Sequence, residues 1–409
     1  MEVAMRVLVS GASIAGPVLA YWLSRRGFDV TVVERAAALR KTGGHAVDLF
    51  RPAMEISERM GVIDEVRERA TGTTRMILQR TNGRRPVDVD YLKLVGVISD
   101  RHVEIMRDDL SQIYYDAGRD DAEYLFGDQI TAIADDGTVD FAHAGQRRYD
   151  IVVGADGLHS GVRQLVFGPD TGRSRFLGGY LAVLSVPKSL ARDGEMTNFL
   201  DTGRWAMIYT ADHLDDARAV FLFRPEQPLD YHHRDDARQR VLLRAAFAGL
   251  NPTVDRWLAE LDGPGSFYFD SITQLELTSW SRGRVTLVGD AGYCPGPAVG
   301  GSTSLAVLGA YVLAGELERA GGDHVAAFAA YEAVMADPVR HSRAFARTVA
   351  KSLVPRSEFG VWALVAAGRT LDALPAGLTR AVAKLNTSGV RLYDAMGYPD
   401  YPVPASTGG

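Results

Sequence analysis

The sequence has 409 residues, a length that allows two or three domains and a sizeable buried core. Hydrophobic residues make up 46% and charged residues 23%, as in ordinary globular proteins, and the formal net charge of -6 gives no pull toward nucleic acid. The one cysteine, Cys294, excludes an internal disulfide, and no stretch reaches the ~20 apolar residues of a membrane span. Composition thus excludes an extracellular scaffold, a membrane channel and a disordered regulator, and predicts a cytoplasmic globular protein.

The first 34 residues predict one βαβ unit. Residues 5–10 are continuously apolar, which is typical of a buried strand, and a helical pattern follows until Gly27 ends it. Residues 28–34 are rich in β-branched side chains and predict a second strand. Such a unit indicates a parallel sheet with helices on its faces.

The remaining elements alternate between strands and helices. Residues 76–79 and 86–94 predict a hairpin around Asn82-Gly83, which suits a two-residue turn. The further predictions are a helix at 104–117, a strand at 149–153, strands within 176–223, helix at 235–261, a strand at 284–288, a long apolar helix at 302–317, mostly helix at 326–396, and an irregular segment at 398–404.

This order of elements predicts an α/β fold in three parts. A Rossmann-type dinucleotide-binding domain is interrupted by a β-rich substrate domain and followed by a C-terminal helical region. The expected ranges are 1–72, 101–172 and 275–345 for the dinucleotide-binding domain, 73–100 and 173–274 for the substrate domain, and 346–409 for the helical region.

The turn after the first strand reads Gly11-Ala12-Ser13-Ile14-Ala15-Gly16. A pyrophosphate binds well at a helix N-terminus, where free N–H groups and the helix dipole favour negative charge. Gly11 permits the tight turn, Gly16 allows close packing of helix and strand, and Ser13 stands where a middle glycine is usual. Glu34, 23 residues after Gly11, is placed to accept a hydrogen bond from a ribose hydroxyl.

Two other interpretations of this turn are open. A hydrolase elbow also joins a strand to a helix, but it requires glycine where this chain has Ala15. A glycine turn without any ligand is the second alternative. The turn alone does not separate FAD from NAD.

Two further segments lie at predicted strand ends. Asp156-Gly157 follows the strand at 149–153, and Gly289-Asp290 follows the strand at 284–288. Ligands of open α/β sheets bind at the carboxyl ends of the strands. With these motifs in this order, the chain resembles the single-component FAD-dependent aromatic hydroxylases typified by para-hydroxybenzoate hydroxylase. Within them it is most similar to the tetracycline-inactivating and antibiotic-tailoring monooxygenases.

The resemblance implies FAD as the cofactor, with a loop at residues 43–49 and a helix start at 107–110 flanking the flavin. Asp156 matches a motif that handles both FAD and the pyridine nucleotide. The implied cofactor-binding residues are Gly11, Ser13, Ala15 and Gly16 at the pyrophosphate, Glu34 and Arg35 at the adenosine, Gly44 and Arg107 beside the flavin, Asp156, and Asp290 at the ribityl chain.

The start of the apolar helix carries Gly300, Gly301 and Ser302. Free N–H groups there, with the helix dipole behind them, would stabilise the negative charge of a reduced flavin. The chain also departs from the family pattern. Tyr293 and Cys294 follow Gly289-Asp290 where the family has other residues, and an acidic residue common further along the helix is absent at 308–309.

The resemblance implies a reaction cycle in which NADPH or NADH reduces FAD, O2 adds at flavin C4a, and the hydroperoxide passes its distal oxygen to an electron-rich ring. His45 is a catalytic candidate that could bind or deprotonate a phenol, or could equally turn to solvent. No metal is expected, since only His232 and His233 are close in sequence and neighbouring side chains point apart.

The substrate cavity is expected in the β-rich domain. Arg204, Met207 and Tyr209 lie with Trp205 along one predicted strand, so one face of it could line the cavity, although plain sheet packing explains the pattern equally well. Pro295, close after Asp290, is the other candidate lining residue.

We therefore expect an NAD(P)H- and O2-dependent FAD monooxygenase that hydroxylates an aromatic or polycyclic, polyketide-like small molecule, with no nucleic acid or membrane partner. Alternatives are an FAD-dependent oxidase or dehydrogenase on the same scaffold, and a non-catalytic flavoprotein that protects a reactive intermediate. A halogenase is disfavoured because the sequence has no Trp-x-Trp-x-Ile-Pro segment.

Overall fold

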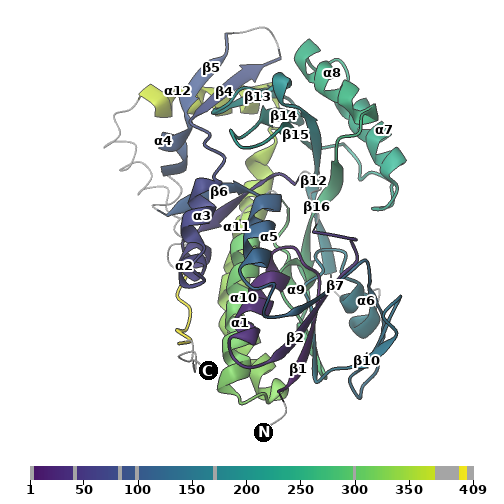
Figure 1. Cartoon of the computed structure of the whole chain (residues 1–409). Coiled ribbons are helices and arrows are strands. Elements are labelled where there is room, and N and C mark those ends of the chain that lie inside the picture. Colours follow the sequence, from purple (N-terminus) through teal and green to yellow (C-terminus); the bar gives the residue numbers. More distant parts are fainter. Residues whose placement is uncertain are drawn as a thin grey trace.

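The computed structural model describes residues 4–39, 44–81, 85–96, 101–168, 173–297, 301–373 and 396–402. One hydrophobic core surrounds a six-stranded sheet in the lower half of Figure 1. Its strand order is β17 (Ser281–Arg282), β18 (Val285–Leu287), β11 (Ile151–Gly154), β1 (Arg6–Ser10), β2 (Asp29–Glu34) and β7 (Glu123–Phe126). The five strands from β18 to β7 are parallel to one another, while β17 is antiparallel to β18, so the carboxyl ends of these five strands meet at one edge.

The helices of this half pack on the sheet and on one another. Helix α1 (Ala15–Ser24) contacts α10 (Ser302–Arg319), which also contacts α2 (Arg51–Arg59) and β3 (Ala46–Phe50). Helix α10 is buried from Ser304 to Leu317, because it is apolar on every side and is enclosed by other elements. The predicted βαβ unit, the strands at 149–153 and 284–288 and the long apolar helix are all confirmed.

A two-stranded antiparallel sheet pairs β3 with β6 (His102–Met106). Two predictions were wrong here. Residues 104–106 belong to β6 rather than to the predicted helix, so α5 (Arg107–Asp116) begins at Arg107, and residues 46–49 belong to a strand rather than to a loop. The physical reason is tertiary pairing, since these strands are stabilised by partners about 55 residues away along the chain, which a local pattern does not reveal.

The upper half contains a seven-stranded sheet. Its order is β16 (Phe267–Glu276), β12 (Arg173–Pro187), β15 (Asp216–Phe223), β14 (Arg204–Tyr209), β13 (Glu195–Asp201), β4 (Arg75–Arg80) and β5 (Val87–Asp90). All neighbours are antiparallel except β13 and β4. The hairpin of β4 and β5 is confirmed, while Asn82-Gly83 lies outside the described residues.

The two faces of this sheet have different neighbours. One face packs against α7 (Asp236–Phe247) and α8 (Pro252–Ala259), with Phe221, Phe247 and Trp257 in a shared core. The other face shares a core with Met106 at the end of β6 and with Ala346 and Val361 from the C-terminal helices. The second face is therefore the one turned toward the six-stranded half.

The C-terminal region is helical as predicted over α11 (His324–Leu353) and α12 (Glu358–Ala373), and residues 396–402 are irregular. Helix α11 contacts both α10 and β12, and Figure 1 shows it extending from the level of α10 to the seven-stranded sheet. The division into three sequence ranges stays a prediction.

Four shorter helices are α3 (Ile63–Glu68), α4 (Tyr91–Gly96), α6 (Gly161–Phe167) and α9 (Asp290–Tyr293), and short 3-10 turns lie at Lys188–Leu190 and Glu260–Asp262. Three further strands are β8 (Ile130–Ile133), β9 (Thr138–Phe141) and β10 (Gln146–Arg148).

Candidate functional site

The turn after β1 leads into α1 and is hydrogen-bonded to the end of β2. The Gly11 N–H donates to the Val33 carbonyl at 2.8 Å, and the Ala12 N–H donates to Glu34 Oε2 at 3.0 Å. Glu34 Oε1 accepts from the Ala36 N–H at 2.8 Å, while Arg35 is exposed. The Glu34 carboxylate thus lies at the entry to α1, where a ribose contact was predicted.

Two glycines of this turn have no room for a side chain. A Cβ at Gly16 would lie 1.8 Å from the Gly11 carbonyl oxygen, and a Cβ at Gly11 would lie 2.6 Å from the Ala155 carbonyl oxygen. Gly11 also has a φ of +106°. The turn therefore keeps its backbone against neighbouring elements, and no side chain caps the start of α1, an arrangement that fits the phosphates of a dinucleotide cofactor.

Arg107 and Asp290 are brought to the same edge. The Arg107 Nη2 donates to Ser13 Oγ at 3.1 Å. Asp290 is the first residue of α9 and follows the end of β18 after Val288 and Gly289. Burial raises the pKa of the Asp290 carboxyl, although the positive charge of Arg107 and a hydrogen bond from Cys294 oppose that shift. Sequence motifs from three distant segments therefore form one charged cluster of Ser13, Arg107 and Asp290.

Asp156 has a clear local role. Its carboxylate accepts from Ser160 Oγ at 2.5 Å, from the Gly161 N–H at 2.8 Å and from the Val162 N–H at 3.1 Å, so it caps the start of α6. Arg163 in that helix donates to the Ala291 carbonyl at 2.8 Å. The Asp156 segment and the Asp290 segment are thus tied together.

Gly44 and His45 lie beside Arg107. A Cβ at Gly44 would lie 3.1 Å from the Arg107 Cβ, and the Gly44 N–H donates to Asp108 Oδ2 at 3.3 Å. His45 is half-buried, and burial lowers the pKa of its imidazole to about 4, with Arg107 acting in the same direction and Asp48 against it. The imidazole is therefore neutral near pH 7 and is able to donate or accept a hydrogen bond.

The candidate substrate-lining residues of β14 lie on two different faces of the seven-stranded sheet. Met207 and Trp205 pack on the sheet face turned toward the six-stranded half, and Tyr209 is buried in the same core. Arg204 is a correction: its side chain lies on the opposite face, where Nη1 donates to the Ala246 carbonyl of α7 at 3.3 Å and Nη2 pairs with Asp201. Side chains of a strand alternate, so residue 204 cannot share a face with 205, 207 and 209.

Tyr268 of β16 was missed by the sequence reasoning. It packs on the same sheet face as Met207. Burial raises the pKa of its hydroxyl well above the ordinary value, Asp270 adds to that shift, and Arg107 opposes it. Tyr268 therefore lies within electrostatic reach of Arg107, where the apolar face meets the charged edge. Its alternating pattern in a β-rich segment was visible, but its strand partners were not.

The residues near the start of α10 complete the edge. Gly300 lies outside the described residues, Gly301 has a φ of +78°, and Ser302 is the first helical residue. Pro295 is buried, and its carbonyl accepts from Gln274 Nε2 at 3.0 Å.

Two departures from the family pattern are one coupled feature. Tyr293 is buried, and a Cβ at Gly309 would lie 1.9 Å from its hydroxyl oxygen. Any residue larger than glycine at position 309 is therefore incompatible with the present position of the Tyr293 side chain. These two changes concern packing behind the edge.

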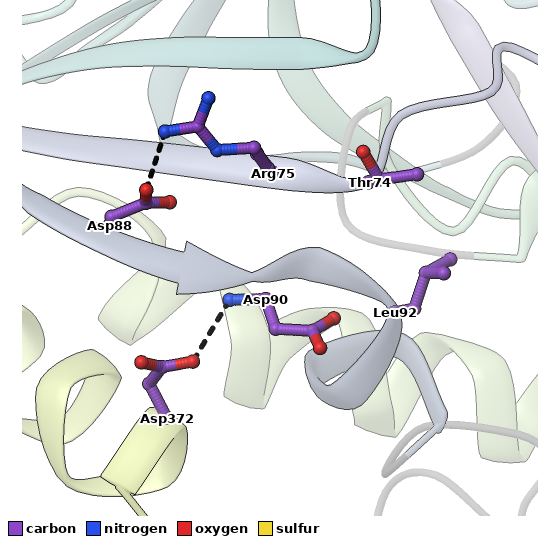
Figure 2. A pocket seen from close by; sticks show the side chains of 6 residues that line it. All are labelled: Thr74, Arg75, Asp88, Asp90, Leu92 and Asp372. Atoms are coloured by element: carbon purple, nitrogen blue, oxygen red, sulfur yellow. Dashed lines mark hydrogen bonds and ion pairs between the residues drawn. The ribbon is translucent and has the colours of Figure 1, made fainter.

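A hollow of about 470 Å³ lies elsewhere, between β4, β5 and α12, as Figure 2 shows. Its charges are mutually engaged, since Arg75 pairs with Asp88, and Asp372 accepts from the Asp90 N–H at 3.2 Å. It contains none of the motif residues. Among the described residues, no group of three or more His, Cys, Asp or Glu side chains could hold a metal ion, and no helix is long and apolar enough to cross a membrane.

Comparisons with known proteins show the family of this chain. Residues 4–322 match the family model described as an FAD binding domain. A flavin-dependent monooxygenase of Legionella longbeachae is 34% identical over 357 residues, which cover 87% of this chain and 91% of that protein. The chain belongs to the flavin-dependent monooxygenases.

Further relatives of this flavin-dependent monooxygenase include an uncharacterized protein of Mycobacterium tuberculosis, 41% identical over 332 residues that cover 80% of this chain and 88% of that one. Among solved structures, the tetracycline destructase Tet(55) is 34% identical, with a TM-score of 0.82 over 98% of this chain and all of that chain. FAD is the cofactor of the family, and the predicted α/β fold with its FAD-binding domain is confirmed.

Proposed function

We propose that this flavin-dependent monooxygenase uses NAD(P)H and O2 to hydroxylate an aromatic or polycyclic, polyketide-like small molecule. The observation that carries the proposal is the meeting of two surfaces: the apolar sheet face with Trp205, Met207 and Tyr268, and the charged edge with Arg107 and Asp290. Flat apolar substrates bind in cavities lined by such side chains with a few polar groups.

FAD would be held along the edge of the six-stranded sheet. We assign the pyrophosphate to the turn at Gly11–Gly16 with Ser13 and Ala15, and the adenosine to Glu34 and Arg35. Bound FAD supplies the redox chemistry and the activation of oxygen. The other assigned residues are Gly44, Arg107, Asp156, Asp290, Gly300, Gly301 and Ser302.

Each protein group has a definite task in this proposal. Arg107 and Asp290 fix the position of the cofactor through charge and hydrogen bonding, and Asp156 shapes the loop that the pyridine nucleotide approaches. Trp205, Met207 and Tyr268 exclude water from the reacting atoms.

His45 would act at the hydroxyl group of the substrate. Its neutral imidazole accepts the hydroxyl proton as a hydrogen bond at one ring nitrogen and so orients an electron-rich ring. A phenol that is hydrogen-bonded in this way carries more electron density on its ring, which favours attack on an electrophilic oxygen.

The test is a panel experiment. Tet(51) and Tet(55), tetracycline destructases 31% and 34% identical to this chain, make tetracyclines the first compounds to try, followed by phenols and polycyclic polyketides. NADPH oxidation is recorded with and without each compound, and products are analysed by mass. The proposal predicts faster oxidation with one compound and a product heavier by one oxygen atom. A compound that is oxidised without gaining oxygen and without NADPH consumption indicates an oxidase or dehydrogenase. Absence of both NADPH consumption and product indicates a protective flavoprotein.

A further inference from the structure

The backbone around His45 is held from two directions. On the six-stranded side, the start of α5 supplies both contacts. The Gly44 N–H donates to Asp108 Oδ2 at 3.3 Å, and the His45 carbonyl accepts from the Arg107 N–H at 3.3 Å. These bonds fix the segment to the edge that carries the flavin motifs.

The second direction is the seven-stranded sheet. The Ala46 N–H donates to the Tyr209 hydroxyl at 2.7 Å, and Arg218 Nε donates to the Gly44 carbonyl at 3.4 Å. Tyr209 and Arg218 are direct partners in the register of β14 and β15, so their side chains stand next to each other on one face. Both are buried, at 3% and 5% exposure. The seven-stranded sheet therefore holds the residue before His45 and the residue after it.

Neither the Arg218 guanidinium nor the Tyr209 hydroxyl depends on residues 44–46 for its electrostatic environment. Arg218 Nη1 already forms an ion pair with Asp216 Oδ2 at 2.6 Å. Tyr209 faces Glu104, Asp48 and Arg218, and burial keeps its hydroxyl protonated by raising its pKa. A phenylalanine at 209 would fill the same space but lack the hydroxyl that accepts from the Ala46 N–H, so this substitution removes that hydrogen bond and leaves the packing.

We propose that Tyr209 and Arg218 are positioning residues, which hold His45 beside Arg107 at the point where a substrate hydroxyl meets the flavin edge. This rests on the proposed function for the contact between His45 and substrate. It also revises the role expected for Tyr209, whose hydroxyl is engaged by the protein rather than by the ligand. The seven-stranded sheet would thus set the geometry of the histidine as well as the shape of the cavity.

The positioning of His45 can be followed through the pKa of its imidazole. Burial lowers the pKa of the His45 imidazole to about 4, Arg107 assists, and Asp48 opposes. Release of residues 44–46 from the sheet would hydrate the imidazole and move it away from Arg107. Its pKa would then rise toward the ordinary value of about 6.5. A merely structural loss of stability would not move this titration in a folded protein.

The experiment uses FAD-loaded enzyme with isotope-labelled histidine, and follows side-chain NMR signals between pH 4.5 and 8, with the His45 signal assigned by loss in His45→Gln. His45 of the wild type should stay mostly neutral over this range and begin to take up a proton only near its lower end. In Tyr209→Phe and Arg218→Met we expect His45 to become largely protonated at pH 5. The KM for a stimulating phenolic substrate should rise roughly tenfold, the scale of one hydrogen bond.

Arg204→Met is the matched control, because Arg204 lies on the same strand but on the opposite face. It should leave the His45 titration unchanged. If Arg218→Met does not fold, Arg218→Lys replaces it. Because lysine keeps the positive charge, His45 should titrate nearly as in wild type in Arg218→Lys, and should have a raised pKa in Tyr209→Phe. Folded, yellow Tyr209→Phe and Arg218→Met proteins with wild-type His45 titration would overturn the proposal. Wild type that produces no oxygenated compound refutes the proposed function instead, and the NMR result stands apart from it.

Discussion

Two surfaces are built in different ways: the edge of the six-stranded sheet, and the inner face of the seven-stranded sheet, which is the face turned toward the six-stranded half. The edge is made of short segments directly after β1, β11 and β18, so its residues are fixed by strand ends and by tight backbone contacts such as that of Gly16. The inner face is made of single side chains from strands that pair across long stretches of the chain. A cofactor shared by a whole family suits the first construction, and a variable substrate suits the second.

The comparison predicts that backbone changes at the edge are the most damaging. In Gly16→Ala the new Cβ would lie 1.8 Å from the Gly11 carbonyl oxygen, so the turn must open. We expect colourless protein that retains no FAD, destabilised by ~3 kcal/mol or more. Absorbance at the flavin band and thermal unfolding measure this. Gly397→Ala is the control, because a Cβ there meets nothing within 4 Å and its φ is not positive. Normal FAD content in Gly16→Ala would show that the turn is not the pyrophosphate site.

Packing behind the edge gives the next effect. Gly309→Ala should lower the free energy of unfolding by ~2 kcal/mol, because its Cβ would lie 1.9 Å from the Tyr293 hydroxyl oxygen. Tyr293→Phe removes that oxygen, so the double variant should recover most of the loss. A double-mutant cycle by chemical denaturation measures the coupling, and additive costs would contradict it.

Charge at the edge separates cofactor binding from stability. Burial raises the pKa of the Asp290 carboxyl in the folded apoprotein, so its ionised form lowers the free energy of unfolding. This cost is fully present above the pKa of the folded state and disappears as the pH falls below the pKa of the unfolded state. Asp290→Asn should therefore bind FAD about tenfold more weakly, while its apoprotein unfolds at a higher temperature than wild type at pH 7. The advantage should vanish near pH 3. Equal unfolding temperatures at pH 7 would refute the raised pKa.

The inner face should give the smallest and most selective effect. Met207→Ala is expected to raise the KM of the substrate about fivefold, a cost of ~1 kcal/mol, without changing FAD content, because Met207 packs on the inner face only. Steady-state kinetics on the responding compound measures it, beside Arg204→Met. A larger effect for Arg204→Met would reverse the assignment of the two faces.

The same contrast explains what the sequence could predict. The turn at Gly11, the Asp156 and Asp290 segments and their strands were predictable, because each motif and the strand before it are adjacent in the chain. The start of α5 was misplaced because β6 is stabilised by β3, which is remote in sequence. Alternation along the strand already separates Arg204 from residues 205, 207 and 209, so grouping it with them was an avoidable error. Which of the two faces turns inward is set by tertiary contacts and could not be predicted.

The roles of Tyr268, Arg218 and Tyr209 depend on distant partners in the same way. Tyr268 acquires its place by pairing of β16 with β12, and Tyr209 by meeting the backbone of Ala46. No local pattern carries that information. The coupling of Tyr293 to Gly309 was equally hidden, although both departures from the family pattern were visible individually.

The most direct test of the account is an isotope experiment with the purified, FAD-loaded enzyme. NADPH and the compound that stimulates its oxidation are supplied under oxygen gas labelled with the heavy isotope, and the product is weighed by mass spectrometry. The account predicts one labelled oxygen atom in the product. Product oxygen that comes from water, or substrate that is oxidised without gaining oxygen, would contradict it.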